Sequence, residues 1–246
     1  LDGDWSRRDA DWRLDERYGL MRRYQPEAML INNTGIGQQG KVSHPELDSV
    51  TFEQHAATPI DRTGHTKYLA GEMCQTMNSH WGIGAHDLAY KSVPELITFL
   101  ARCRKVGANY LLNIGPEGSG RIPDLERATL SRIGAWTRMC GPAIYEGKPT
   151  NYECMGNDFI LACKGKLYYF AHDLRVSGDA NVTLAVGGAG PRVIRNLDAT
   201  IKRVRWIDNG EELGRLQREG TSYAAIDCTG YPYGTNLVVR VAEIEI

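Results

Sequence analysis

Apolar and polar positions follow different patterns in the two halves of the chain. Up to about residue 148, short apolar runs alternate with stretches whose apolar residues recur every three or four positions. Beyond it, short runs rich in β-branched and aromatic residues follow one another, with Gly, Asn and Asp between them. The first pattern is typical of strands joined by helices, and the second of an antiparallel sheet. We therefore predict an α/β region over residues 1–148 and an all-β region over residues 151–246.

Three stretches of the first half have the spacing of amphipathic helices. Residues 13–24 are charged, with apolar side chains at helical spacing. The clearest helix starts at Ser92, where Glu95 completes a capping box, and it ends before Gly107. A third helix starts near Asp124 and is predicted to bury a row of apolar side chains: Leu125, Ile133, Trp136 and Met139.

Short apolar runs predict the strands. In the first half they cover residues 28–31, 68–73 and 109–114, and in the second half residues 159–162, 166–171, 181–186, 199–206 and 237–241. Strands that alternate with helices imply parallel pairing through helical crossovers. A complete (β/α)8 barrel takes about 250 residues. We therefore predict a partial, roughly half, (β/α)8-type barrel followed by an antiparallel β-sandwich with short turns.

The composition narrows the classes of partner. Hydrophobic residues make up 42% of the 246 positions and charged residues 24%, which is ordinary for a folded globular chain. The 29 basic and 30 acidic side chains give a formal net charge of -1. Nucleic acids and anionic membranes attract basic surfaces, so neither is expected as the main partner. No apolar run approaches the roughly 20 residues of a membrane span, and no signal peptide is visible at Leu1.

The common sequence signals of metal, redox and serine chemistry do not occur. The six cysteines include no C-x-x-C pair, which favours free thiols over a zinc ribbon or a redox site; disulfides stay open as an alternative. The histidines have no metal-ligand spacing, and the chain has no G-x-S-x-G motif. The Gly187–Gly190 segment precedes no helical pattern, so a phosphate loop is not expected there.

Carboxylates fall where strands of the predicted barrel end. Asp2 or Asp4 follows the first strand, Glu53 lies in residues 49–55, and Glu72 lies in residues 68–73. Reactive groups of parallel barrels lie at the carboxyl ends of the strands, and two carboxylates suffice for retaining glycoside hydrolysis. From the residues alone, ordinary surface carboxylates remain the alternative.

One aromatic residue of the first half has a comparable position. Trp81 follows a predicted barrel strand, so its ring could stack on a sugar. A tryptophan of the core or of the rim is an equally good interpretation of the residue alone.

Several blocks of the first half together carry a family resemblance. Residues 71–82 (GEMCQTMNSHWG), 90–92 (YKS), 106–116 (VGANYLLNIGP) and 120–123 (GRIP) resemble, in order and spacing, the α-L-fucosidases of glycoside hydrolase family 29. The resemblance covers about residues 1–148. The β-rich remainder resembles the C-terminal sandwich of that family in kind and position only.

The resemblance implies roles for particular residues. The segment from Leu1 to Trp5 resembles the strand end with the family's nucleophile, which implies Asp2, with Asp4 as the second choice. Glu53 resembles the acid/base, Trp81 the aromatic residue against the fucose methyl group, and Glu72 an acidic position at the pocket rim. Asp2 must then stay ionised while Glu53 holds a proton near neutral pH, with the two carboxyl groups about 5–5.5 Å apart.

The implied activity is that of a retaining exo-α-L-fucosidase. It would release terminal α-L-fucose from an oligosaccharide or glycoconjugate through a covalent glycosyl-enzyme intermediate, without a metal ion or cofactor. The implied locations are secreted, periplasmic or lysosomal.

The chain also departs from the family. It lacks the histidines and aromatic residues that earlier barrel strands supply to the fucose hydroxyl groups, and Asn32-Asn33-Thr34 stands where some members have a sugar-binding arginine. A non-catalytic carbohydrate-binding or scaffolding remnant is therefore the alternative function.

A half barrel also leaves strand edges unpaired, which is unfavourable. A fragment of a longer enzyme, a split enzyme with a separate complementing half, and a self-associating half barrel would each account for this. We expect a homo-oligomer, since symmetric association would pair the edges.

Overall fold

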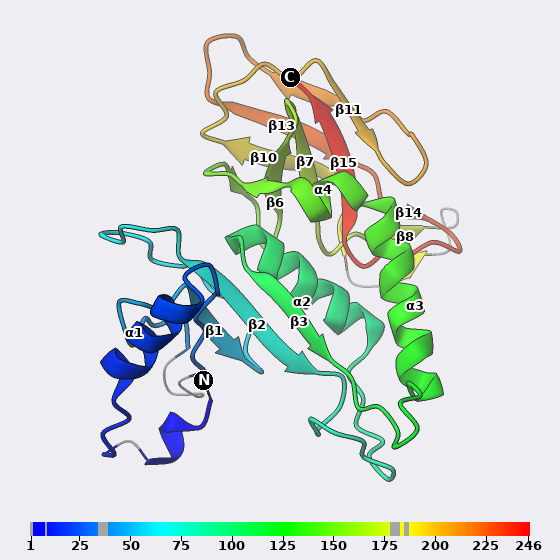
Figure 1. Ribbon diagram of the computed structural model, residues 1–246. Coiled ribbons are helices and arrows are strands. Elements are labelled where there is room, and N and C mark those ends of the chain that lie inside the picture. Colours follow the sequence, from blue (N-terminus) through cyan, green and yellow to red (C-terminus); the bar gives the residue numbers. More distant parts are fainter. Residues whose placement is uncertain (1, 8, 34–38, 178–182, 185–186) are drawn as a thin grey trace. The chain divides into compact units, whose positions relative to one another are not determined.

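The computed structural model of the chain describes residues 2–7, 9–33, 39–177, 183–184 and 187–246. Its backbone contacts separate into two compact units, residues 1–91 with 106–126 and residues 92–105 with 127–246. Figure 1 shows the chain from its N-terminus to its C-terminus. In the part that the structure describes, no helix is both long and apolar enough to span a membrane.

The first unit contains a parallel sheet. Its three strands are β1 (Ser49–Glu53), β2 (Ala70–Thr76) and β3 (Asn109–Asn113), hydrogen-bonded in that order and lying side by side in Figure 1. Two isolated parallel bridges add two chain segments: Ile31 is bridged to Ser49 of β1, and Asp2 is bridged to Asn33 of the same segment as Ile31. Five segments therefore run parallel, and the carboxyl ends of β1, β2 and β3 lie at one edge of the sheet.

The strand predictions of this unit hold to different degrees. The prediction for 109–114 is confirmed by β3, whereas the one for 68–73 lies two residues too early, since β2 begins at Ala70. The strand predicted over 28–31 is wrong, because only Ile31 forms a bridge there. Leu30 is nevertheless buried, at 2% exposure, in a small core with Tyr18 and Leu47. The apolar run over residues 28–31 therefore predicted the burial of Leu30 correctly, but it does not form a regular strand.

Two helical segments precede the sheet in the chain. A 3-10 turn, η1, covers Asp4–Arg7, and the predicted helix over residues 13–24 is confirmed as α1 (Leu14–Tyr24). Tyr18 is the buried residue of α1, at 1% exposure. Burial and the nearby negative charge of Asp4 raise the pKa of the Tyr18 phenol.

The helix predicted after Ser92 is confirmed in detail. In α2 (Val93–Val106), the backbone N–H of Ser92 donates to Glu95 Oε2 at 2.8 Å, and the backbone N–H of Glu95 donates to Ser92 Oγ at 3.3 Å. This reciprocal pair is the capping box that the sequence predicts. Gly107 ends the helix with φ +73°, a backbone conformation that glycine adopts without steric penalty.

Two further helices follow, α3 (Asp124–Met139) and α4 (Gly141–Glu146). Ile133 and Trp136 of α3 are buried as predicted, and the Trp136 indole N–H donates to the Val239 carbonyl oxygen at 2.8 Å. The prediction for Leu125 is wrong, because this first-turn residue is 54% exposed. The apolar side chain of Leu125 therefore led to a wrong prediction of burial at the start of the helix.

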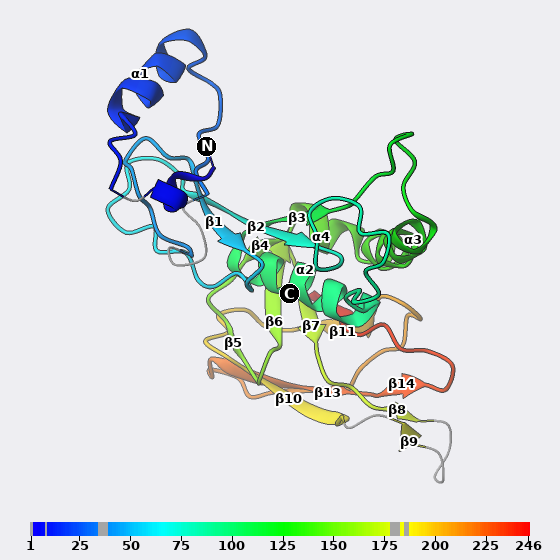
Figure 2. The same cartoon turned by 90° about the horizontal axis from the view of Figure 1, so that it is seen from below.

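The second unit contains the sandwich. A five-stranded sheet has the order β11-β15-β7-β6-β4, and a four-stranded sheet the order β12-β13-β10-β5. Buried side chains of both sheets, among them Tyr169 and Ile226, belong to one hydrophobic core. Figure 2 shows β6 and β7 in one layer and β10 and β13 in the other. A smaller sheet has the order β14-β8-β9.

Most pairs of this unit are antiparallel, although β14 and β8 pair in parallel. The strands have these bounds: β4 (Lys148–Pro149), β5 (Glu153–Cys154), β6 (Phe159–Cys163), β7 (Lys166–Ala171), β8 (Val176–Ser177), β9 (Thr183–Leu184), β10 (Gly190–Arg195), β11 (Arg203–Trp206), β12 (Arg215–Gln217), β13 (Tyr223–Cys228), β14 (Tyr231–Pro232) and β15 (Arg240–Glu245).

The sequence predicted this unit's class better than its strands. The predictions for 159–162 and 166–171 are confirmed by β6 and β7. The strand predicted over 199–206 is shorter, the one over 237–241 begins three residues later, and the one over 181–186 lies mostly outside the described residues. Both β10 and β13 were missed, because neither has a clear apolar–polar alternation.

Candidate active site

Glu53 is the last residue of β1 and lies at the carboxyl edge of the parallel sheet. The next residue, Gln54, has φ +56°, which is uncommon for a residue with a side chain. Its backbone N–H still donates to the Cys74 carbonyl oxygen of β2 at 2.9 Å, and β1 ends at Glu53. Strained backbone of this kind is concentrated at functional sites.

Two amide side chains hold Glu53. The Glu53 backbone N–H donates to Gln39 Oε1 at 2.7 Å, and Gln39 Nε2 donates to the Glu53 carbonyl oxygen at 3.4 Å. Nδ1 of His55 lies 2.8 Å from the same carbonyl oxygen. The side chain has a separate partner, since Asn33 Nδ2 donates to Glu53 Oε2 at 2.7 Å. Both the backbone and the carboxylate of Glu53 are therefore fixed.

Asp2 and Asp4 face different surroundings. Asp2 Oδ1 accepts from the Gly3 backbone N–H at 2.8 Å and from the Trp5 indole N–H at 3.3 Å. Asp4 Oδ2 instead accepts from the buried Asn32 Nδ2 at 2.9 Å. Asp4 therefore has a structural partner, whereas the partners of Asp2 belong to its own turn.

The Cys74 thiol reports which carboxylates lie together. Burial first, and then the negative charges of Glu53, Glu72 and Asp2, raise the pKa of Cys74 to about 11. Electrostatic effects of this kind weaken with distance, so Asp2, Glu53 and Glu72 share one neighbourhood around the thiol. Asp2 is also linked to Glu53 through Asn33, whose backbone bridges Asp2 and whose side chain donates to Glu53.

The register of the sheet explains the rest of this neighbourhood. Glu53, Cys74 and Leu111 are directly paired across β1, β2 and β3. Glu72 precedes Cys74 by two residues, so both side chains point to the same face of the sheet. Asn109 is paired with Glu72 in β3, and its Nδ2 donates to Glu72 Oε2 at 2.9 Å. Glu72 is thus half-buried and held by a neighbouring strand.

Trp81 lies on the loop that follows β2, with 45% of the residue exposed. Its carbonyl oxygen accepts from Asn113 Nδ2 at 2.7 Å, which ties the loop to the end of β3. No hydrogen bond or ring contact among the described residues links the indole to Asp2, Glu53 or Glu72. The structure therefore places Trp81 at the same end of the sheet as Glu53 without joining it to the carboxylates.

Asp87 organises the Trp81 loop. Its carboxylate accepts from the backbone N–H groups of Ala89 and Ser79 at 2.8 and 2.9 Å, and it lies 2.9 Å from His80 Nδ1. Hydrogen bonds from Ala89 and Ser79, followed by that of His80, lower the pKa of Asp87 to about 2. The loop is thus closed around an ionised carboxylate across most of the pH range.

A glycine lets the same loop approach β3. A Cβ atom added to Gly115 would lie 2.7 Å from the backbone carbonyl carbon and oxygen of Gly82. The residue next to Trp81 therefore packs directly on the backbone after β3. The Gly115 N–H donates to the buried carboxylate of Glu126 at 3.1 Å.

Metal and disulfide chemistry have no site in the described residues. No group of three or more His, Cys, Asp or Glu side chains there is arranged to hold a metal ion. All six cysteines are free thiols. Carboxylates, side-chain amides, the His55 imidazole and the Cys74 thiol lie at this edge of the sheet.

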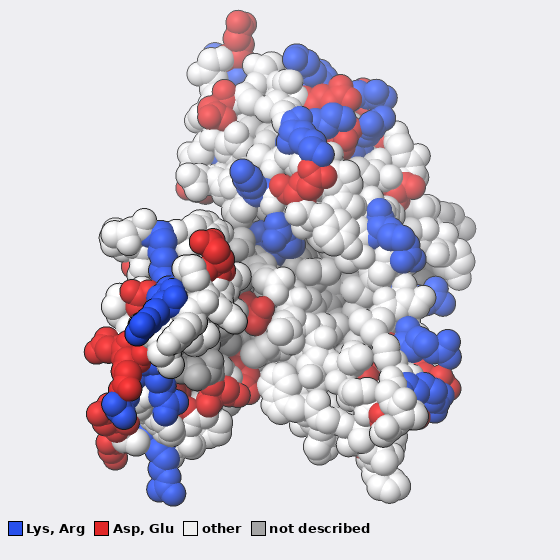
Figure 3. Space-filling model, viewed as in Figure 1, with Lys and Arg blue, Asp and Glu red and all other residues white. Residues whose placement is uncertain are grey.

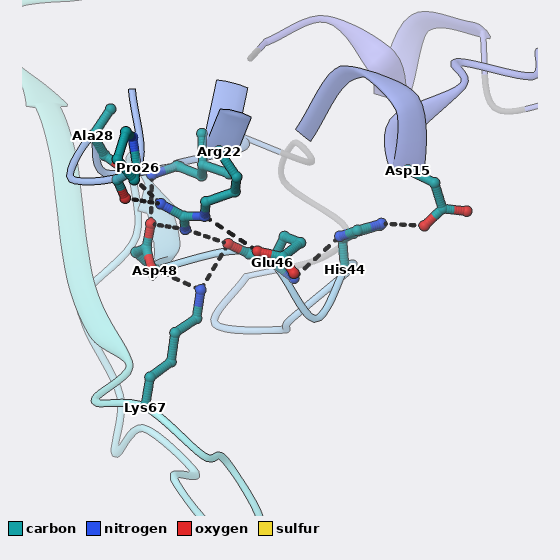
Figure 4. A network of polar contacts seen from close by, with 9 residues as sticks. Asp15, Arg22, Pro26, Ala28, His44, Glu46, Asp48 and Lys67 are labelled. Atoms are coloured by element: carbon teal, nitrogen blue, oxygen red, sulfur yellow. Dashed lines mark hydrogen bonds and ion pairs between the residues drawn. The ribbon is translucent and has the colours of Figure 1, made fainter. Parts of the chain in front are cut away.

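Charges near α1 are mixed in sign. Figure 3 shows Lys and Arg interleaved with Asp and Glu over this helix. Close by, Asp48 accepts from Arg22 at 2.6 Å and from Lys67 at 2.7 Å, as Figure 4 shows. Asp48 also accepts from the Leu30 backbone N–H at 2.7 Å. The network fixes the chain directly before β1, and therefore the strand that carries Glu53.

Sequence reasoning missed three residues of the site: Asn33, Gln39 and Cys74. Asn33 was noted only as part of a triplet that lacks an arginine, and Cys74 only as one free thiol among six. Gln39 carried no signal at all. Asn33 and Glu53 are 20 residues apart, which corresponds to no helix or strand periodicity, so the contact can be recognised only from the fold.

The family follows from comparison with known proteins. Residues 1–142 match the family model for alpha-L-fucosidase, which is more than half of the chain. The parallel sheet with carboxylates at its edge fits a glycoside hydrolase. The chain belongs to the alpha-L-fucosidase family.

Curated relatives and solved structures agree. The chain is 31% identical over 174 residues to tissue alpha-L-fucosidase of Bos taurus, and this match covers 68% of the chain and 35% of the relative. It is 26% identical over 165 residues to tissue alpha-L-fucosidase of Rattus norvegicus, and this match covers 65% of the chain and 34% of the relative. Alpha-L-fucosidase isoenzyme 1 from Paenibacillus thiaminolyticus has a TM-score of 0.69 and 25% identity, covering 95% of this chain and 53% of that one.

More distant structures share the fold. The Thermotoga maritima alpha-fucosidase, solved with a mechanism-based inhibitor, has a TM-score of 0.62 at 21% identity, covering 95% of this chain and 49% of that one. The chain spans about a third of the length of these curated relatives and about half of these solved chains.

Proposed function

We propose that this chain carries the catalytic carboxylates of a retaining exo-α-L-fucosidase. It would release terminal α-L-fucose from fucosylated oligosaccharides or glycoconjugates. The observation that carries the proposal is the link between the two carboxylates through Asn33, whose backbone bridges Asp2 and whose side chain donates to Glu53. Membership of the alpha-L-fucosidase family supports the substrate class.

In the first step, Asp2 is the nucleophile. Its carboxylate attacks the anomeric carbon of fucose while the bond from that carbon to the leaving oxygen breaks. Glu53 donates its proton to that oxygen, so the aglycone departs as an alcohol. The products are a covalent fucosyl ester of Asp2 and an ionised Glu53.

In the second step, Glu53 acts as the base. It removes a proton from water, whose oxygen attacks the anomeric carbon as the ester bond to Asp2 breaks. Two inversions restore the starting configuration, and Glu53 is protonated again. This double role requires carboxyl groups about 5–5.5 Å apart.

Trp81 and Glu72 have supporting roles. The exposed face of the Trp81 indole suits the apolar methyl group of fucose, because an aromatic ring buries such a group without unpaired polar atoms. Glu72 would accept hydrogen bonds from fucose hydroxyl groups at the rim, beside Asn109. Asp4, held by Asn32, would support the turn that carries Asp2.

The five parallel segments would form part of a (β/α)8-type barrel. Exposed Leu111, at 42%, lies on the face that a closed barrel buries. A second copy of the chain or a complementing barrel half would cover this face and add the missing contacts to the sugar. The mechanism requires neither a metal ion nor a cofactor.

A fluorogenic aryl α-L-fucoside tests the proposal. The wild-type chain is expected to hydrolyse it, and Asp2→Gly to lose activity by at least about a thousandfold. Azide should restore part of the rate by attacking from the vacated side, giving a fucosyl azide. Asp4→Gly is the matched control and should keep more activity. Wild-type protein that binds fucosides without turning them over would instead identify a carbohydrate-binding or scaffolding remnant.

A further inference from the structure

Asn33 lies between the two proposed catalytic carboxylates. Its backbone forms a parallel bridge with Asp2, and its side-chain Nδ2 donates to Glu53 Oε2 at 2.7 Å. The segment that contains it is itself bridged to β1 through Ile31 and Ser49. Asn33 therefore belongs to the chain segment that separates the nucleophile from the acid/base.

The amide restricts where Glu53 can carry a proton. An amide nitrogen only donates hydrogen bonds, so an oxygen that accepts from it at 2.7 Å cannot direct a proton of its own along the same line. The carbonyl oxygen of a carboxylic acid accepts a hydrogen bond better than its hydroxyl oxygen does, so the contact at Oε2 favours the proton of a protonated Glu53 on Oε1. Oε1 is thus the oxygen left to face the leaving group and, in the second step, the water.

The amide also acts on the charged form of Glu53. Asp2 and Glu72 are the other carboxylates whose charges act on the Cys74 thiol beside Glu53. The Cys74 thiol is neutral near pH 7, since its pKa is about 11, and His55 contacts the Glu53 carbonyl oxygen rather than the carboxylate. Asn33 Nδ2 is the side-chain donor that contacts the Glu53 carboxylate, and a hydrogen bond to a carboxylate favours its ionised form.

We propose that Asn33 is the positioning residue of the acid/base: it orients the Glu53 carboxyl group so that Oε1 carries the proton, and it favours the carboxylate that the second step needs. The inference rests on the proposed function and adds to it a residue outside the carboxylate pair. Gln39 has a different part, since it contacts only the Glu53 backbone.

The test compares Asn33→Leu with Gln39→Met. Asn33→Leu keeps the approximate side-chain volume and removes the donor. We expect the alkaline limb of the kcat/KM profile to move up by about one pH unit, as the loss of one hydrogen bond to a charged group predicts. Gln39→Met should lower kcat/KM equally across the pH range without moving the limb.

Leaving groups provide a second kinetic readout. Phenyl α-L-fucoside needs a proton on its leaving oxygen, whereas the 2,4-dinitrophenyl fucoside does not. In Asn33→Leu, kcat/KM should fall roughly tenfold for the first and less than about twofold for the second. Equal losses for both substrates with an unmoved limb would overturn the inference, because a merely structural change acts on both.

A readout without turnover separates this inference from the proposed function. In protein with 13C at the glutamate carboxyl carbons, the Glu53 signal is assigned by its absence in Glu53→Gln. Its titration midpoint should rise by about one pH unit in Asn33→Leu. An unmoved midpoint overturns the inference even if fucosides are hydrolysed. A raised midpoint in a chain that hydrolyses no fucoside supports the effect of Asn33 while the proposed function fails.

Discussion

At the scale of single residues, the Cys74 thiol is an internal probe of the proposed site. Its pKa is raised to about 11 by burial and then by the charges of Glu53, Glu72 and Asp2. The thiolate is the reactive form, so a raised pKa slows alkylation at any pH below it. Removing one of these charges lowers the pKa and increases the thiolate fraction.

This predicts an order of reactivity at pH 9. Iodoacetamide should alkylate Cys74 roughly threefold faster in Glu53→Gln and in Asp2→Asn than in the wild-type chain. Asp4→Asn is the matched control and should change the rate little, because the Asp4 carboxylate is bonded to the buried Asn32 instead. Peptide mass spectrometry separates Cys74 from the other thiols. Acceleration in Asp4→Asn but not in Asp2→Asn would reverse the choice of nucleophile.

At the scale of elements, the Asp48 network connects α1 with the start of β1 (Figure 4). Burial by itself raises the pKa of Asp48, but hydrogen bonds from Lys67, the Leu30 N–H and Arg22 outweigh it and lower the pKa to about 2 from 3.8. A carboxyl with a lowered folded pKa stabilises the fold above its unfolded pKa. That stabilisation is lost as the pH falls through the folded value.

We therefore expect Asp48→Asn to lower the free energy of unfolding at pH 7 by about 2 kcal/mol and to weaken its dependence on pH between about 4 and 2. Glu46→Gln is the control, since Glu46 also pairs with Arg22, but its side chain is 48% exposed. Such an exposed pair contributes less than about 1 kcal/mol. Urea unfolding of both variants at several pH values measures the difference. An equal loss of unfolding free energy in both variants would refute the prediction that Asp48 contributes more than Glu46.

Local signals explain which elements could be predicted. The capping box of Ser92 and Glu95 acts within one helical turn, so the sequence alone located the start of α2. Residues 28–31 are apolar enough for a strand, but whether they pair depends on distant segments. The sequence of β10 (GPRVIR) contains a proline, a glycine and two arginines, and it has no alternation of apolar and polar residues. This segment is a strand because it pairs with β13.

The candidate site was predictable only in part for the same reason. Carboxylates at strand ends follow from the order of elements, which indicated Glu53 and Glu72 as candidates. Family resemblance was needed to prefer Asp2. The contacts of Glu53 with Asn33 and Gln39 span 20 and 14 residues, and no periodicity encodes them.

At the scale of the whole molecule, apolar exposure predicts association. Met29 and Leu111 are 59% and 42% exposed, and β3 has no strand on its outer side among the described residues. Covering even a few hundred Å² of apolar surface contributes several kcal/mol at about 25 cal/mol per Å². A sheet edge with free N–H and C=O groups adds a template for pairing.

We expect the 27.4 kDa chain to form a homo-oligomer, with a dimer as the simplest form, when light scattering measures its mass. Leu111→Lys should shift the mass toward the monomer, because it places a charge in the apolar face. Leu88→Lys is the control, since Leu88 is 93% exposed on the loop after β2 and outside that face. A stable, active monomer of the wild-type chain would refute this prediction.

The assignment of Asp2 as the nucleophile is tested most directly by trapping the covalent intermediate. An L-fucosyl fluoride with a second fluorine at C2 should form the glycosyl-enzyme and break down slowly, because the C2 fluorine destabilises the oxocarbenium-like transition state. After incubation with the wild-type chain and proteolysis, mass spectrometry should find one fluorofucosyl group on the peptide that contains Asp2, with fragmentation placing it on that residue. A label on Asp4, or fucoside turnover with no labelled carboxylate, would contradict the assignment of Asp2 as the nucleophile.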